Sequence, residues 1–137
     1  MIEQLCMMEE FHRAFGHPVN VPEYITEEDD REINIELIKL RSKLHSEECK
    51  ELNDQLWDDY SSHKISPNLL KEGADLLYVV LGTFVSLGLG NQLIEAFKRV
   101  HESNMSKLDE NGKPIYRDDG KVLKGPNYKP PVLDDLV

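Results

Sequence analysis

Apolar residues recur at helical spacing through most of the first 108 positions, because positions three and four apart lie on one face of a helix. The pattern predicts helices over residues 2–15, about 27–61, 67–87 and about 91–107. Gly16 should end the first helix, while Thr26, Ser66 and Asn91 are expected N-caps of the later ones. Four helices of this length predict an all-α fold, a four-helix bundle.

Each predicted helix has one face expected to lie toward the core. On the two central helices this face contains acidic residues as well as apolar ones. The expected inward positions are Leu5, Met8 (or Glu9), Phe11 (or His12) and Phe15; Leu37, Leu40, Leu44 and Glu48; Leu69, Glu72, Leu76 and Val79 (or Val80); and Leu93, Ile94, Phe97, Val100 (or His101) and Asn104. Glu48 and Glu72 interrupt apolar seams, where an unpaired acid is costly. This placement favours a bound cation over a solvated acidic surface.

After residue 107 the helical periodicity stops and turn-forming residues dominate. Asp118-Asp119-Gly120 lies between 114–117 and 121–124 and can form a short hairpin. At 137 residues the chain is expected to be one domain, 1–137. It would consist of a helical core over about 2–108 and an irregular C-terminal tail over 109–137.

The net charge of −10 argues against a nucleic-acid partner. Residues 1–97 hold 19 of the 26 acids and 8 of the 16 Lys+Arg, whereas residues 98–137 hold 7 acids and 8 bases. A tail with net positive charge can meet phosphates while the acidic part holds a metal.

Cysteine usage and hydropathy predict a cytoplasmic protein without a membrane partner. Cys6 and Cys49 have no zinc-ligand spacing, and a reducing compartment would keep them as thiols. The longest apolar stretch, Leu76–Leu89, is too short to span a bilayer. No N-terminal signal pattern is present.

Four carboxylates carry the chemistry predicted from the sequence. Glu48 and Glu51 are spaced i, i+3, and so are Glu72 and Asp75, so each pair leaves one face of its helix. Facing helices would gather four like charges, which need a cation. Carboxylate oxygens suit hard divalent ions, above all Mg²⁺, with Mn²⁺ expected to substitute. Glu47 can add a ligand or orient and deprotonate a water. A ferritin-like diiron site is disfavoured, because only one Glu-x-x-His is present, at Glu9 to His12.

The sequence resembles the all-α nucleoside triphosphate pyrophosphohydrolases, which include MazG, the dimeric dUTPases, dCTP pyrophosphatase and phosphoribosyl-ATP pyrophosphohydrolase. Glu47-Glu48-x-x-Glu51, twenty residues (52–71) and Glu72-x-x-Asp75 are similar to their EExxE…ExxD signature. The segments around Phe11-His12 and Val100-His101, and the tail 112–128, resemble the MazG-like, phosphoribosyl-ATP-pyrophosphohydrolase-like branch. Cys49 and Lys50 fill the variable positions of the first motif and remove no ligand.

The resemblance implies a MazG-like fold and Mg²⁺-dependent hydrolysis of a nucleoside triphosphate to monophosphate and pyrophosphate. The metal ligands would be Glu48, Glu51, Glu72 and Asp75, with Glu47 completing the catalytic set. The implied substrate-binding residues are His12, Asn104, Lys107, Lys124 and Tyr128. A homodimer or homotetramer would build each site.

Two other functions remain open from the sequence. One is the phosphoribosyl-ATP pyrophosphohydrolase step of histidine biosynthesis, which shares the chemistry and differs in substrate. The other is a non-catalytic helical module whose acids bind a structural or regulatory cation. Turnover of common nucleoside triphosphates would distinguish a nucleoside triphosphate pyrophosphohydrolase from both of these alternatives.

Overall fold

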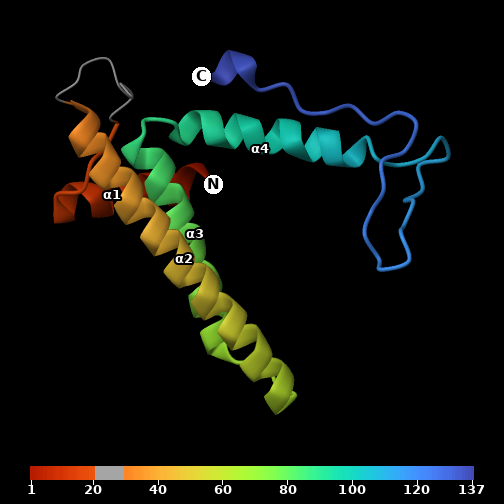
Figure 1. The fold of residues 1–137 in the computed structure, drawn as a ribbon, viewed down its shortest axis with the longest axis horizontal. Coiled ribbons are helices and arrows are strands. Elements are labelled where there is room, and N and C mark those ends of the chain that lie inside the picture. Colours follow the sequence, from red (N-terminus) through yellow and green to blue (C-terminus); the bar gives the residue numbers. More distant parts are fainter. Residues whose placement is uncertain (21–29) are drawn as a thin grey trace. The chain divides into compact units, whose positions relative to one another are not determined.

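The computed structural model describes residues 1–20 and 30–137, and within residues 30–34 only the backbone. The described residues form four α-helices and a short 3₁₀ turn and contain no strand (Figure 1). The elements are α1 (Ile2–Phe15), α2 (Asp30–Ser62), α3 (Pro67–Ser86), α4 (Gly90–Met105) and η1 (Asp134–Leu136). The all-α prediction is confirmed. No described helix is both long and apolar enough to cross a membrane.

The described contacts separate the chain into two compact units, Met1–Gly90 and Asn91–Val137. The first unit holds α1, α2 and α3, and the second holds nearly all of α4 together with the tail. The assignment of residues 1–137 to a single domain therefore stays a prediction.

Helix α1 ends where the sequence indicates. Gly16 adopts a left-handed conformation with φ of 71°, which glycine tolerates because it lacks a Cβ, and the His17 N–H donates to the His12 carbonyl at 2.8 Å. Leu5, Met8 and His12 are buried. Phe15 is 69 % exposed, so its assignment to the inner face is wrong; the helix has already turned past the α1–α3 contact at its last residue.

Helices α2 and α3 lie side by side and form a helical hairpin (Figure 1). Asp59, near the end of α2, is buried and accepts hydrogen bonds from the Ser66 N–H at 2.8 Å and the Gln55 side chain at 2.7 Å. Ser66 occupies the predicted N-cap position of α3, but its hydroxyl makes no capping bond and accepts from Gln55 instead. The hairpin turn is therefore fixed by an acid on α2.

The inner face of α2 follows the predicted stripe with one change. Leu37 is buried and Leu44, Glu48 and Gln55 are half-buried, but Leu40 is 41 % exposed and its neighbour Arg41 is buried instead. The stripe turns by one residue at this point, because Arg41 hydrogen-bonds to groups on α1 and α3. The expected cap Thr26 and the expected helix start near Glu27 lie outside the described residues.

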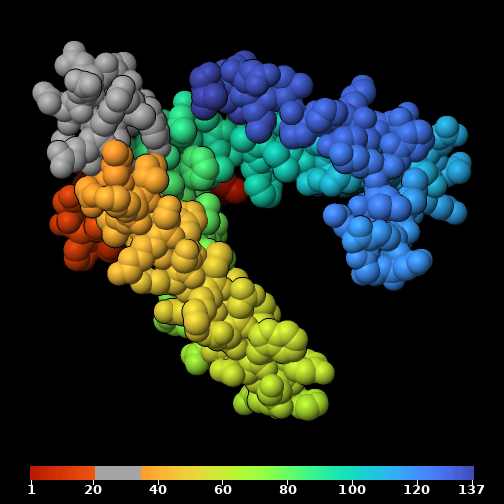
Figure 2. All heavy atoms as spheres, viewed as in Figure 1, coloured from red at the N-terminus to blue at the C-terminus, as the bar shows by residue number. Residues whose placement is uncertain are grey.

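The predicted face of α3 is confirmed, since Leu69, Glu72 and Leu76 are half-buried and Val79 is buried. Helix α1 contacts the later part of α3, where a Cβ added at Gly82 would lie 2.9 Å from Met8. It also reaches Gly90, the first residue after the α3–α4 turn, where an added Cβ would lie 3.4 Å from Leu5. The space-filling view shows the α2–α3 hairpin, orange to green, extending beyond α1 (Figure 2).

In the second unit, the C-terminal segment runs back along α4. Arg99 on α4 forms a two-point ion pair with Asp135 (Nη2 to Oδ2, 2.9 Å) and donates to the Val132 carbonyl at 3.0 Å. The Lys129 N–H donates to the Ser106 hydroxyl at 2.9 Å. The segment thus packs on a polar face of α4, and the expected inward residue Phe97 is 60 % exposed.

The start of α4 and the hairpin of the tail both lie close to their predicted positions. Helix α4 begins at Gly90, so Asn91 lies within its first turn rather than before it. The predicted hairpin closes with a single antiparallel bridge between Tyr116 and Val122, and Gly120 takes the left-handed turn position at φ of 84°.

Candidate metal centre

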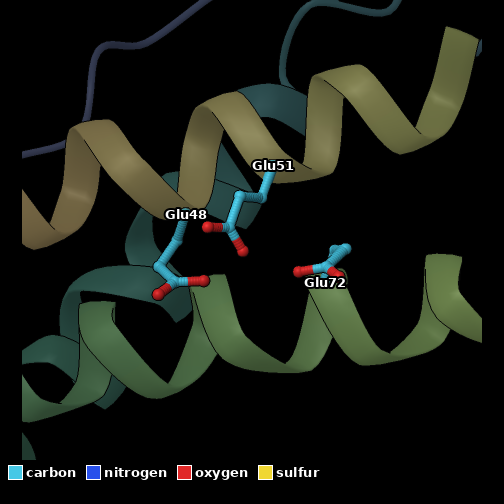
Figure 3. Close-up of side chains that lie close together, drawn as sticks. All are labelled: Glu48, Glu51 and Glu72. Carbon is cyan, nitrogen blue, oxygen red and sulfur yellow. The ribbon is translucent and has the colours of Figure 1, made fainter.

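Three of the four predicted carboxylates meet between the two central helices. Glu48 and Glu51 leave α2 toward α3, and Glu72 leaves α3 toward α2 (Figure 3). One carboxylate oxygen from each lies within 4.8 Å of the others. The i, i+3 spacing on α2 and the hairpin turn together produce this convergence.

Glu48 holds a buried carboxylate oxygen within this cluster. Its side chain is half-buried, and its Oε2 atom is buried without a hydrogen-bond partner among the described residues. Desolvation raises the pKa of Glu48, and the negative charges of Glu51, Asp75 and Glu72 raise it further, while Lys71 opposes them. The site therefore holds negative charge that the described protein groups do not fully neutralise.

Asp75, the fourth predicted ligand, is not a member of this three-oxygen cluster. Its Oδ2 lies 2.9 Å from the Nζ of Lys71, which also donates to Glu72 at 3.0 Å. These two contacts raise the pKa of Lys71. Glu47 lies outside the cluster as well, and its exposed carboxylate is 3.7 Å from Lys43.

His12, which the resemblance implies to be a substrate-binding residue, lies in the core of the first unit. Its side chain is fully buried; Nδ1 lies 2.8 Å from the Pro18 carbonyl, and Nε2 lies 3.1 Å from the Arg41 guanidinium. Burial lowers the pKa of His12, and the charges of Arg41 and His17 lower it further, against the Pro18 bond. His12 thus joins α1 to α2 within the core, and a substrate contact for it stays a prediction.

The remaining predicted substrate residues lie in the second unit as two local pairs. Lys107 donates to the Asn104 side chain at 2.7 Å, and the Lys124 ammonium stands 4.5 Å from the centre of the Tyr128 ring. The pairs are joined through Gly125, whose N–H donates to the Lys107 carbonyl at 2.9 Å. The structure therefore gathers all four residues at the junction of α4 and the tail.

Sequence reasoning missed two residues that shape these sites. Lys71 was not singled out, although its i, i+4 spacing to Asp75 was a usable signal. Arg41 is buried against His12 and Ser86, at 3.1 and 3.0 Å. No local signal distinguishes a buried arginine from an exposed one on the same helix.

The family model of phosphoribosyl-ATP pyrophosphohydrolase matches residues 8–104, which is well over half of the 137 residues and includes Glu47 and all four predicted metal ligands. The chain belongs to the phosphoribosyl-ATP pyrophosphohydrolase family. Among curated proteins, no sequence matches the chain significantly. Membership of this family makes the chain a hydrolase of phosphoanhydride bonds, a pyrophosphohydrolase of nucleotide type. Lys107, Lys124 and Tyr128 lie beyond the matched residues.

The residues of this pyrophosphohydrolase fit a hard divalent cation. The donors are carboxylate oxygens only, which suit Mg²⁺ and Mn²⁺ better than softer metals. The Glu48 Oε2 atom has no partner among the described residues, and burial together with the neighbouring acids raises the pKa of Glu48, so positive charge at the cluster would be favourable. A cation would supply both the missing partner and the missing charge.

The raised pKa of Glu48 predicts a stability effect in the metal-free chain. The unfolded carboxyl ionises near its ordinary value of 4.5, and the folded one at higher pH. The folded state therefore loses stability as the pH rises from about 4.5 through the folded pKa. Glu48→Gln, which removes the charge, should raise the Tm at pH 7 by a few degrees and change it little below pH 4.5.

Thermal unfolding in chelator at pH 4 and pH 7 measures this effect. Glu36→Gln is a matched control, since Glu36 is an exposed acid on the same helix and its partner is Lys39 at 2.6 Å. An unchanged or lowered Tm for Glu48→Gln at pH 7 would contradict the charge repulsion described here.

Proposed function

We propose that this chain is a Mg²⁺-dependent nucleoside triphosphate pyrophosphohydrolase that converts a (d)NTP and water to a (d)NMP and pyrophosphate. The observation that carries the proposal is the convergence of Glu48, Glu51 and Glu72 between two helices, with Asp75 beside them. The family match to residues 8–104 supports the class of reaction.

Glu48, Glu51, Glu72 and Asp75 would hold the metal. When bound, a divalent cation neutralises phosphate oxygens and lowers the pKa of an attacking water. The half-buried position of Glu48 and Glu72 keeps part of the site away from bulk solvent, which strengthens its electrostatic interactions. Glu47 remains a predicted base. Its carboxylate lies next to Lys43, and this position does not support that role.

Asn104, Lys107, Lys124 and Tyr128 are proposed to bind the substrate. Two ammonium groups and an amide at the junction of α4 and the tail suit phosphate and sugar oxygens. The Lys124 ammonium against the Tyr128 ring keeps that cation close to an aromatic face on which a base can stack. The net positive charge of residues 98–137 favours a polyanionic ligand.

Phosphoribosyl-ATP is the second candidate substrate, because the matching family model is the one for that activity. The reaction type is the same, and the difference lies in what the substrate-binding residues accept.

Incubation of the purified chain with each common NTP and dNTP and with phosphoribosyl-ATP, in Mg²⁺, tests the proposal by product separation. Monophosphate and pyrophosphate from one or a few NTPs or dNTPs are expected. Turnover of phosphoribosyl-ATP alone would replace the first substrate class by the second. Thermal stabilisation by Mg²⁺ without turnover of any of them would favour the non-catalytic cation-binding module.

We further propose that the chain assembles as a homodimer or homotetramer. Large apolar side chains are exposed at the end of α2: Trp57 (69 %), Tyr60 (72 %) and Leu56 (48 %). They line two adjoining hollows of about 450 and 580 Å³, and exposed apolar surface of this kind is typical of interfaces. Light scattering should give two or four times the single-chain mass, and Tyr60→Asp should lower it. A single-chain mass for the unmodified protein would contradict the assembly.

A cytoplasmic location is also proposed. Cys6 and Cys49 are free and exposed thiols, which a reducing compartment preserves.

A further inference from the structure

Among the described residues, Lys71 is the one cation that forms ion pairs with the four predicted metal ligands. Its Nζ lies 2.9 Å from Asp75 Oδ2, 3.0 Å from Glu72 Oε1 and 3.1 Å from Glu72 Oε2. Lys71 lies on α3, and the described lysines of α2 pair with acids outside the cluster: Lys39 with Glu36, Lys43 with Glu47 and Lys50 with Asp54. Lys71 therefore differs from these lysines, because its partners are two of the predicted metal ligands.

The contacts of Lys71 coincide with the one difference between the predicted and observed carboxylate sets. Glu48, Glu51 and Glu72 share a cluster, whereas Asp75, which is bound to Lys71, is not part of it. Glu72 belongs to both arrangements, since it contacts Lys71 and also lies within 4.8 Å of the other two glutamates. The Lys71 ammonium thus forms ion pairs with two of the four carboxylates that are predicted to bind a divalent cation.

We propose that Lys71 is an internal counter-ion that competes with the divalent cation for Glu72 and Asp75 and so sets the metal affinity of the site. This inference rests on the proposed metal-dependent function. In the metal-free chain, the ammonium offsets part of the repulsion among the four acids. When a metal binds, Asp75 must leave Lys71, and a positive charge remains near the bound cation. Both effects weaken metal binding.

The side chain of Lys71 can make this exchange, because it is 59 % exposed and carries a flexible four-carbon stem. Its ammonium can move into solvent without opening the core. The Lys71–Asp75 pair is exposed on both sides, at 59 % and 43 %, so little stability is lost when Asp75 leaves Lys71 for a divalent cation. Lys71 is a positioning residue under this proposal, acting through Asp75 and Glu72.

Calorimetric titration of the full chain with MnCl₂, and separately with MgCl₂, tests the proposal without relying on turnover. Lys71→Met should bind metal about three- to tenfold more tightly than the wild type. Lys71→Gln should show the same gain in metal affinity. Lys71→Arg, which keeps the charge, should bind metal with an affinity close to that of the wild type. In chelator the Tm of Lys71→Met should fall, and the rise in Tm on adding metal should be larger than in the wild type.

Lys39→Met is the matched control, because it removes one lysine charge from the same unit while its partner Glu36 lies outside the cluster. Its metal affinity should stay within about twofold of the wild type. An equal or weaker affinity for Lys71→Met and Lys71→Gln overturns the proposal. If the wild type binds metal and turns over substrate in that case, the proposed function stands. If the wild type binds neither metal, the proposed function fails and this inference fails with it.

Discussion

Glu48→Gln is expected to lower pyrophosphate release by at least about a hundredfold, because metal-assisted phosphoryl transfer draws several kcal/mol of transition-state stabilisation from the bound cation. The substitution replaces one of the three clustered carboxylates by a neutral amide, a poorer ligand for a hard cation. The measurement is kcat/KM with the substrate that the product separation identifies.

Glu36→Gln serves as the control here too and should keep nearly full activity, since Glu36 is exposed and pairs with Lys39. Asp75→Asn should also lose most of its activity, because Asp75 is proposed to complete the ligand set. A loss of less than about threefold in Glu48→Gln would show that the cluster does not carry the chemistry. Together with the expected gain in metal-free stability, a large loss would identify the repulsion at Glu48 as a cost tolerated for function.

Gly82→Ala is expected to destabilise the chain by about 1–3 kcal/mol, because α3 passes so close to its neighbours that an added methyl group overpacks the core. A Cβ at Gly82 would stand 2.9 Å from Arg41 Nη1, His12 Nε2 and Met8 Cε. The His12 ring is fully buried and is held by the Pro18 carbonyl and the Arg41 guanidinium, so it cannot move aside cheaply. Chemical denaturation of both proteins in chelator measures the difference.

Gly73→Ala is the matched control on the same helix, where no atom of the described residues lies within 4 Å of the added Cβ. Alanine is favoured over glycine in a helix interior by about 0.5–1 kcal/mol, so this variant should be more stable than the wild type. Opposite signs for the two substitutions would confirm the close contact at Gly82. A stabilising Gly82→Ala would show instead that the Arg41–His12 cluster yields easily.

The sequence was sufficient to predict the helices, because their signals are local. Gly16 ends α1 and Pro67 begins α3 through backbone properties that no tertiary contact needs to reinforce. The convergence of Glu48, Glu51 and Glu72 was also predictable, since it needs only an i, i+3 spacing and an antiparallel neighbour.

The errors arose where a tertiary contact outweighed hydropathy. Leu40 is the more apolar residue, yet Arg41 is buried because its guanidinium meets His12 and Ser86 across two helices. Phe97 was expected to face inward, but the C-terminal segment covers the polar face of α4 that carries Arg99, through the ion pair of Arg99 with Asp135. Hydrophobic periodicity identifies an apolar face and does not identify which face a polar segment will cover.

The four predicted metal ligands lie within residues 48–75 of a single helical hairpin. Its two helices, α2 and α3, are joined by a short turn that Asp59 fixes. The mutual distances of the four ligands therefore depend on the α2–α3 pairing and not on residues 91–137. Sequence drift, and even insertions in the exposed turns around Gly112 and Gly120, can alter α4 and the tail while the carboxylates keep their spacing. Lineages of this chain could thus diversify the tail and conserve the hairpin, so that acquiring a new substrate need not mean rebuilding the metal centre.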